Sequence, residues 1–412
     1  MPAFTSHTSQ TKNMFIKNDP RMLKNIYGTT DITPYWVADM DFKVAQPISN
    51  ALHDLVNRGV YAYEFNLKGV QSALVAWYEK RHQLSLNSDR FIQVPGVLSG
   101  LALLIREFSS DNDAILLHSP AYHQFESLIT RANRKVVKSE LVIKDGHYQL
   151  DLEAMEQQIQ TQNVKIILMC NPHNPTGRVW NEDELTAVVK LAQRHDIMII
   201  SDEIHSDILL SQSRFTSLAS FDYENIIALL GSPAKTFGMH SISNGYLYTN
   251  NKDYVEQTKA LVSALYLDHG NALSTFATIA AYKEGHEWLD EMLVYLNESV
   301  EWVDAYLQHE LPEVKMFKPQ GTYQIWFDFS ALNLNNNELQ SLLFHKAKMG
   351  LTPSSWFGSN DASLYRMNIA TSLENIQYSF RQLKDAVEEL KSNPDSLPSS
   401  CKDKPKSSTG CC

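Results

Sequence analysis

Between residues 90 and 250, short apolar runs alternate with longer amphipathic stretches. The apolar runs have the length of strands and predict them at 91–94, 114–118, 165–170, 197–201, 226–230 and 245–249. The stretches between them have helical periodicity, most clearly at 99–108, 122–132, 152–160 and 182–194. Strands that alternate with helices form a mostly parallel sheet with helices on both faces. We therefore expect an α/β fold whose ligands bind at the carboxyl ends of the strands.

The rest of the sequence predicts a second, smaller α+β domain. Long helices are expected from about 251 to 309, followed by strands at 323–329 and 364–369 and by helices near 336–349 and 372–391. We divide the chain into a large domain, 46–285, and a small domain made of 1–45 together with 286–391. The tail, 392–412, is rich in Ser, Pro and Lys and is predicted to be disordered.

The composition argues against several classes of protein. The 412 residues include 36 Lys and Arg and 47 Asp and Glu, which gives a formal net charge of −11. A negative charge of this size disfavours binding to nucleic acid, because it repels phosphate backbones. No apolar run is long enough to span a membrane, and residues 1–19 lack the apolar core of a secretory signal. Cys170 is the only cysteine before residue 401, so we expect no disulfide framework and a cytoplasmic location.

Two Asn-Pro pairs follow one of the predicted strands. Residues 166–180 read IILMCNPHNPTGRVW, in which the strand ends at Cys170 and the turn contains Asn174. Proline fixes its own φ and keeps the residue before it extended. We therefore expect the Asn174 amide to be held rigidly at the strand end. The alternative is an ordinary Asn-Pro turn without a binding role.

A carboxylate follows the next predicted strand, in the sequence SDEIH at 201–205. At a strand end, Asp202 could bind a metal, a ribose hydroxyl or a protonated ring nitrogen, or it could simply cap a helix. The sequence has no HExxH motif and no clustered Cys and His residues, so we expect no metal site.

Two basic residues lie in apolar surroundings. Lys235 follows the strand at 226–230, with Ala, Phe, Met and Tyr nearby in the sequence. Desolvation would lower the pKa of its amine and make it a nucleophile toward carbonyls, although a solvated surface lysine is the commoner case. Arg366 interrupts the apolar strand at 364–369, where its guanidinium requires an anion. That anion is either the carboxylate of a ligand or the partner in a structural salt bridge.

Four of these candidates follow one another along the chain in the order Asn174, Asp202, Lys235 and Arg366. In this order they resemble the active-site set of fold type I pyridoxal 5′-phosphate enzymes, in the class I/II aminotransferase superfamily. The motifs WVADMDF at 36–42, SDEIH at 201–205 and GTY at 321–323 look like those of its cystathionine β-lyase branch, the MalY/PatB type of C–S lyases. The resemblance extends over about residues 14–391.

The resemblance implies a role for each candidate. Lys235 would hold pyridoxal 5′-phosphate as a Schiff base and then move the substrate Cα proton, while Asp202 would keep the pyridine nitrogen protonated. Arg366 would bind the carboxylate of an amino-acid substrate, assisted by the backbone near Ala38. The remaining cofactor contacts would be Asn174 and His205 near the 3′ oxygen of the ring, Tyr122 stacked on the ring, and Gly96, Val97, Leu98, Ser232 and Tyr63 at the phosphate. Tyr63 would come from a neighbouring subunit, which implies a homodimer.

The implied reaction is β-elimination of an L-cysteine S-conjugate such as cystathionine, giving a thiol (homocysteine), pyruvate and ammonia. An aminotransferase that uses a keto-acid acceptor would need the same residues, and a regulatory binding protein on the same fold is a third hypothesis. Some residues depart from the pattern of the branch, namely Ala62, Gly238, His240, Ser243 and Asn244. The natural substrate therefore stays open.

Overall fold

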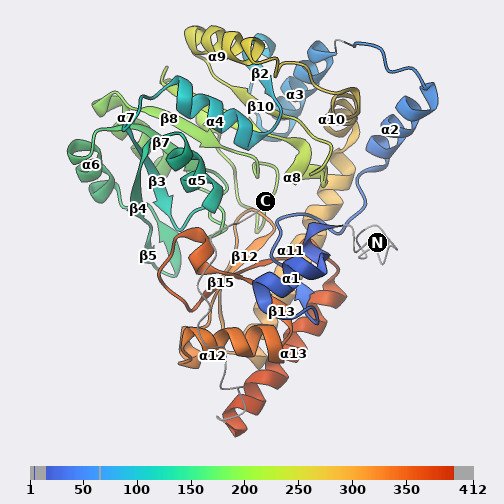
Figure 1. Ribbon diagram of the computed structural model, residues 1–412, viewed down its shortest axis with the longest axis vertical. Helices are drawn as coiled ribbons and strands as arrows, with labels where there is room; N and C mark the ends of the chain where they lie inside the picture. The colour runs from blue at the N-terminus through green and yellow to red at the C-terminus, as the bar shows by residue number, and fades with distance from the viewer. Residues whose placement is uncertain (1–3, 5–14, 65, 394–412) are drawn as a thin grey trace.

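The computed structural model describes residues 4, 15–64 and 66–393 and is built around a seven-stranded sheet (Figure 1). In spatial order the strands are β2 (Phe91–Val94), β10 (Gly245–Tyr248), β9 (Ile226–Gly231), β8 (Met198–Asp202), β7 (Val164–Cys170), β3 (Ala114–Ser119) and β4 (Lys135–Glu140). In this sheet β10 is antiparallel to both of its neighbours, and every other pair is parallel. The predicted α/β class and the six predicted strands are confirmed.

The pattern of apolar runs misses β4, which forms one edge of the sheet. Its sequence, KVVKSE, begins and ends on exposed residues and buries only Val137 and Ser139. An edge strand with one face near solvent does not need a continuous apolar run, so it lacks the signal that marked the central strands.

Successive side chains of a strand point to opposite faces of the sheet, and here both faces carry apolar side chains. Helices therefore cover both faces. Ile115 and Leu117 of β3 pack with α4 (Val97–Glu107) and α5 (His123–Arg131) in one apolar cluster, which also receives side chains of α9 (Lys252–Ala264). Ala114 and Leu116 belong to the cluster on the other face, which includes buried residues of α6 (Leu152–Thr161) and α7 (Glu182–His195). The sheet is therefore buried on both sides, as its nearly unbroken apolar strands require.

A second, antiparallel sheet is built from the C-terminal part of the chain, in the order β11 (Lys315–Phe317), β12 (Gln324–Asp328), β15 (Leu364–Asn368) and β14 (Thr352–Pro353). The long helices α11 (His286–Glu310) and α13 (Leu373–Ser392) pack against each other beside it (Figure 1). The N-terminal segment joins this part of the molecule, because β1 (Thr33–Pro34) pairs in parallel with β13 (Met349–Gly350). The domain boundaries at 45/46 and 285/286 stay a prediction.

Two expectations for this region differ in detail from the structure. The helix expected at 336–349 is a short α12 (Asn336–Gln340) that continues as one π-helical segment, Ser341–Lys346. Ser392, placed in the predicted disordered tail, is the last residue of α13. Asn393 follows as the C-cap of this helix, and residues 394–412 of the predicted tail lie outside the described residues.

The remaining elements flank the two sheets. α2 (Gln46–Arg58) and α3 (Leu67–His82) pack against α10 (Ala272–Glu284), and α1 (Pro20–Tyr27) precedes β1. A hairpin of β5 (Val142–Lys144) and β6 (His147–Gln149) follows β4. Within the described ranges, no helix combines the length and the apolar character that a membrane crossing requires.

The central sheet should dominate the stability of the chain. Ile167 of β7 is completely buried, whereas Ile143 of β5 is 53% exposed. We expect Ile167→Ala to lower the free energy of unfolding by about 2–5 kcal/mol, because it leaves a cavity in a packed core. Ile143→Ala should change it by less than about 0.5 kcal/mol. Urea unfolding of the two variants tests this, and equal losses would contradict the proposed position of the core.

Candidate functional site

The candidate residues come from the carboxyl ends of three neighbouring strands. Asn174 lies in the turn after β7, Asp202 ends β8, and Lys235 belongs to the short helix α8 (Pro233–Phe237) that follows β9. Two further candidates, Ala38 and Arg366, come from the N-terminal segment and from β15 of the second sheet. The site therefore forms where the C-terminal edge of the large sheet meets elements of the smaller one.

Lys235 connects these two parts of the molecule. Its Nζ donates a hydrogen bond of 2.6 Å to the carbonyl oxygen of Ala38. Burial, with a contribution from the positive charge of Arg366, lowers the pKa of the amine to about 8 in spite of the opposing charges of Asp39 and Asp202. Near neutral pH a fraction of this amine is unprotonated, and an unprotonated amine is a nucleophile and a base.

Asp202 and His205 are both buried, at 5% and 3% exposure. Burial raises the pKa of Asp202 to about 7, although the backbone N–H of Ile204, at 3.0 Å from Oδ1, and the charge of Lys235 favour its ionised form. Burial also lowers the pKa of His205 well below its usual value, as do the charges of Lys235 and Arg366. The imidazole is therefore neutral at physiological pH.

Asn174 and Arg366 contact each other directly. One guanidinium nitrogen donates to Oδ1 of Asn174 at 3.0 Å, and another donates to the carbonyl oxygen of Trp36 at 2.7 Å. Arg366 is 4% exposed and packs over the ring of Phe357, 4.8 Å from its centroid. Burial lowers its pKa to about 10, so the group stays charged at neutral pH. Its two hydrogen-bond partners are a neutral amide and a carbonyl, which leaves its charge available to an anionic ligand.

The residues expected at a phosphate group lie around the N-terminus of α4. Gly96 is the N-cap of this helix, Val97 and Leu98 begin it, and the space beside Gly96 is open. Gly245 approaches so closely that a Cβ there would lie 2.8 Å from the backbone nitrogen of Val97. Ser232 caps α8 and donates to Ser243 at 3.1 Å. Helix N-terminal N–H groups and a hydroxyl are suitable donors to an anion.

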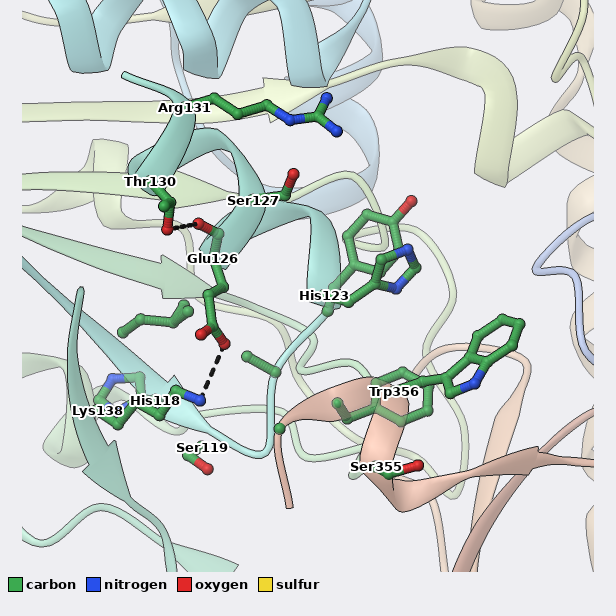
Figure 2. Close-up of a pocket in the computed structure, with 15 residues that line it drawn as sticks. His118, Ser119, His123, Glu126, Ser127, Thr130, Arg131, Lys138, Ser355 and Trp356 are labelled. Atoms are coloured by element: carbon green, nitrogen blue, oxygen red, sulfur yellow. Dashed lines mark hydrogen bonds and ion pairs between the residues drawn. The ribbon is translucent and has the colours of Figure 1, made fainter. Parts of the chain in front are cut away.

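A cavity of about 590 Å³ opens between α5 and the segment 355–358 (Figure 2). Tyr122, the N-cap of α5, lines it together with Phe357, the residue against which Arg366 packs. Glu126 and Lys138 form an ion pair of 2.9 Å on another part of the wall (Figure 2). The rings of His123, from α5, and Trp356, from the segment 355–358, contact each other edge to face. Tyr122 therefore stands at an accessible wall near the candidate site.

Tyr63 differs from the other candidates. It lies between α2 and α3, and its side chain is 96% exposed in the single chain. The single chain does not bring Tyr63 into the arrangement formed by Lys235, Asn174 and Arg366, and its expected role depends on a second subunit.

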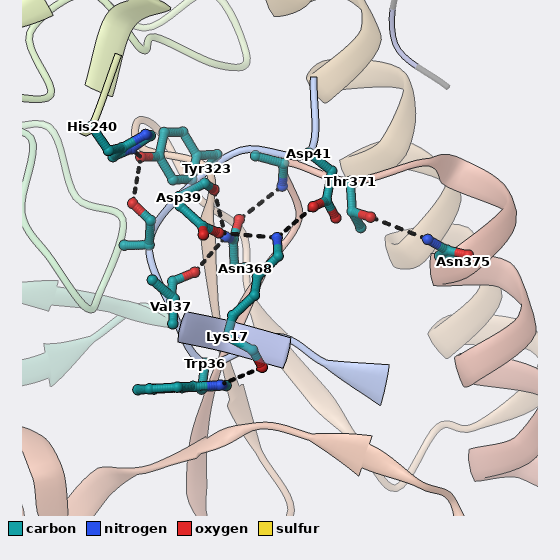
Figure 3. A network of polar contacts seen from close by, with 12 residues as sticks. Lys17, Trp36, Val37, Asp39, Asp41, His240, Tyr323, Asn368, Thr371 and Asn375 are labelled. Atoms are coloured by element: carbon teal, nitrogen blue, oxygen red, sulfur yellow. Dashed lines mark hydrogen bonds and ion pairs between the residues drawn. The ribbon is translucent and has the colours of Figure 1, made fainter. Parts of the chain in front are cut away.

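The segment 36–42 is held in place by polar contacts that the sequence did not indicate (Figure 3). Lys17 forms ion pairs with Asp39 at 3.0 Å and with Asp41 at 2.6 Å. Burial alone would lower the pKa of Lys17, but the two carboxylates outweigh it and raise the pKa. The side-chain amide of Asn368 donates to the carbonyl oxygens of Val37 and Asp39. These contacts determine where the Trp36 and Ala38 carbonyls lie.

The carbonyl of Ala38, which accepts from Lys235, has a second donor in Tyr323, and His240 contacts Tyr323 in turn. The hydroxyl of Tyr323 donates to the Ala38 oxygen at 2.9 Å, and His240 lies 3.4 Å from that hydroxyl. Burial lowers the pKa of His240 to about 3, with a contribution from the charge of Lys235. Tyr323 lies in the GTY motif, which could have indicated it, but its contact joins residues 285 positions apart and is invisible in a local pattern.

The arrangement fits a cofactor with an aldehyde, a ring nitrogen and a phosphate. The Lys235 amine could attack the aldehyde, and a protonated ring nitrogen would favour the ionised form of Asp202. Nδ1 of His205 and Nε of Arg366 are buried without a hydrogen-bond partner in the described structure. No group of three or more His, Cys, Asp or Glu side chains in the described ranges could hold a metal ion.

Comparison with known proteins identifies the family. The model of aminotransferase class I and II matches residues 46–383. The chain belongs to this family. Cystathionine β-lyase PatB of Bacillus subtilis is 32% identical over 88% of this chain and 94% of its own length. Protein MalY of Escherichia coli is 29% identical over 88% of this chain and 93% of its own length.

A solved structure has a similar fold. Cystalysin from Treponema denticola, which contains a pyridoxal 5′-phosphate cofactor, superposes with a TM-score of 0.88 at 28% identity. The match covers 94% of this chain and 99% of the cystalysin chain. The chain is therefore similar over most of its length to a cystathionine β-lyase and to the pyridoxal 5′-phosphate-bound C–S lyase from Staphylococcus hominis. The structure of that C–S lyase superposes with a TM-score of 0.84 at 26% identity and covers 92% of this chain and 97% of its own.

The charges around Lys235 predict opposite effects of two substitutions on its pKa. In cofactor-free protein, competitive acetylation should titrate the Lys235 amine with a midpoint near pH 8. Asp39→Asn removes a negative charge and should lower the midpoint, because the protonated amine loses a stabilising partner. Arg366→Met removes a positive charge and should raise it. A wild-type midpoint at the ordinary value of 10.5, or shifts in the same direction, would contradict this electrostatic description.

Proposed function

We propose that the chain binds pyridoxal 5′-phosphate on Lys235 and catalyses β-elimination of L-cysteine S-conjugates such as cystathionine. The observation that carries the proposal is the position of the Lys235 amine. It has a lowered pKa, lies against the Ala38 carbonyl and is within electrostatic reach of both Asp202 and Arg366. An amine in that position can form a bond to an aldehyde cofactor and move a proton at a bound amino acid.

The other residues would hold the cofactor. Asp202 would pair with the ring nitrogen, Asn174 and neutral His205 would lie at the 3′ oxygen, and Tyr122 would stack on the ring. The N–H groups of α4 at Gly96, Val97 and Leu98, together with the Ser232 hydroxyl, would bind the phosphate. When bound, the cofactor draws electrons away from the substrate Cα and makes its proton acidic.

The substrate would be oriented by its carboxylate. Arg366 would bind that group as a bidentate pair, and its present partners, the Asn174 amide and the Trp36 carbonyl, hold the guanidinium in position. Lys235 would then take the proton from Cα. The electron pair left behind forms a double bond to Cβ as the Cβ–S bond breaks, and the sulfur leaves as a thiolate that takes up the proton held by Lys235. Water converts the remaining enamine to pyruvate and ammonia, so the atoms balance without an oxidant.

We further propose a homodimer. The helices α2 and α3 both pack against α10. Several large apolar side chains near these helices are exposed in the single chain, namely Val56, Val60, Tyr61, Tyr63, Leu67, Leu265, Tyr266 and Leu273. A surface of this kind is typical of an interface between subunits. Tyr63 would then reach the phosphate site of the partner, which accounts for its full exposure in one chain.

A cystathionine assay without any keto acid tests the reaction. We expect the loaded wild type to release pyruvate and homocysteine in equal amounts. Lys235→Ala should lose this activity by at least about 1,000-fold, because it removes the amine that would hold the cofactor and move the Cα proton. The matched control is Lys190→Ala, at an exposed lysine of α7, which should keep wild-type activity.

The same assay distinguishes the alternative. If pyruvate and homocysteine are absent and an amino group is transferred only when 2-oxoglutarate is added, the chain is an aminotransferase and the lyase proposal is wrong.

A further inference from the structure

The helix that carries Lys235 is too short to determine its own position. α8 has only five residues, between the N-cap Ser232 and Gly238, whose φ is 71°. An isolated helix of this length is not stable in water, because the cost of nucleation exceeds the gain from so few hydrogen bonds. The position of the Lys235 side chain must therefore be determined by contacts between α8 and the elements around it.

We propose that Asp207, acting through Thr236, is a positioning residue for Lys235. Thr236 is the next residue in α8, is 1% exposed, and its hydroxyl donates to Oδ2 of Asp207 at 2.9 Å. Asp207 is 2% exposed and lies five residues after Asp202, in the segment that also contains His205. One carboxylate thus links the loop that carries Asp202 and His205 to the helix that carries Lys235.

The carboxylate of Asp207 is itself held from the opposite side by α3. Its Oδ1 accepts a hydrogen bond of 2.9 Å from Nε1 of Trp77 and lies 2.8 Å from Nε2 of His82. Burial alone would raise the pKa of Asp207, but the contacts with His82, the charge of Arg81 and the Trp77 hydrogen bond outweigh it and lower the pKa. A buried carboxylate with three hydrogen-bonded neighbours has a single preferred orientation.

The same indole also packs against α8. The ring of Trp77 meets that of Phe237 edge to face, with centroids 5.5 Å apart, and Phe237 is completely buried. Trp77 therefore contacts α8 directly through Phe237 and indirectly through Asp207 and Thr236. Two anchors on consecutive residues fix both the rotation and the translation of the helix, and with them the direction in which the preceding residue, Lys235, points.

The proposal rests on the proposed function, since it concerns the placement of the proton-transferring amine. The relevant variant is Thr236→Val, which keeps the shape of the side chain and removes its hydroxyl. A small displacement of a catalytic group costs up to about 100-fold in rate, so we expect kcat on cystathionine to fall by roughly 10- to 100-fold. KM should change by less than about twofold, because the contacts of Arg366 are unaltered.

Two measurements separate positioning from a general loss of structure. With substrate deuterated at Cα, the isotope effect on kcat should be larger in Thr236→Val than in wild type, because a displaced amine makes proton transfer more rate-limiting. The visible circular dichroism of the bound cofactor, which requires no turnover, should also change, because Lys235 holds the cofactor. Thr236→Ser keeps the hydroxyl and should restore both values.

Thr249→Val is the matched control. Thr249 is 2% exposed, and its hydroxyl donates at 2.7 Å to the carbonyl oxygen of Ile226 and accepts at 3.2 Å from the backbone N–H of Asn251. This variant therefore loses at least as many hydrogen bonds of a buried threonine as Thr236→Val does. It should leave the isotope effect and the dichroism unchanged. If Thr236→Val does not fold, Trp77→Phe removes the indole N–H that holds Asp207 and should shift both values in the same direction.

The outcomes are distinct. A wild-type isotope effect and wild-type dichroism in folded Thr236→Val would overturn the proposal, as would equal changes in Thr249→Val. If wild type releases no pyruvate from cystathionine, the proposed function fails. In that case the dichroism of the loaded variants still decides whether Asp207 and Thr236 position Lys235.

Discussion

The hydrogen bond from Lys235 to the carbonyl of Ala38 brings together the two parts of the molecule on which the site depends. Lys235 is carried by the large sheet, and Ala38 belongs to a segment fixed by Lys17 and by Asn368 of the smaller sheet. The contact places the amine in surroundings that lower its pKa and, through Trp36 of the same segment, ties it to the position of Arg366. If the two parts were displaced relative to each other, the Lys235 amine and the Arg366 guanidinium would both lose their positions.

Burial has a different consequence for each charged group of the site. Burial lowers the pKa of Lys235 to about 8, which makes its amine a usable base near neutral pH. Burial raises the pKa of Asp202 to about 7, so a cationic partner can shift this group to its ionised form. Arg366 stays charged in spite of burial because its ordinary pKa is so high. One environment therefore supplies an amine that is partly unprotonated near neutral pH, a titratable carboxyl group and a permanent cation.

The central strands and the candidate residues that follow them could be predicted from the sequence, because each is marked by a local pattern of residues. The central strands are buried on both faces and so appear as apolar runs, and Asn174, Asp202 and Lys235 each follow directly after such a run. β4 was missed because an edge strand needs no apolar run. The roles of Lys17 and Asp207 were missed because their partners are distant in sequence: Asp39 and Trp77 are brought to them only by the completed fold. Tyr63 remains a prediction, since its expected contact lies in a second subunit.

The covalent bond between Lys235 and its cofactor is the central claim, and reductive trapping tests it most directly. The protein would be loaded with pyridoxal 5′-phosphate, treated with borohydride to reduce the carbon–nitrogen bond, digested, and mapped by mass spectrometry. We expect one phosphopyridoxyl group per chain, on the peptide that contains Lys235, and none in Lys235→Ala. Modification of a different lysine, or equal labelling of the Lys235→Ala protein, would contradict it.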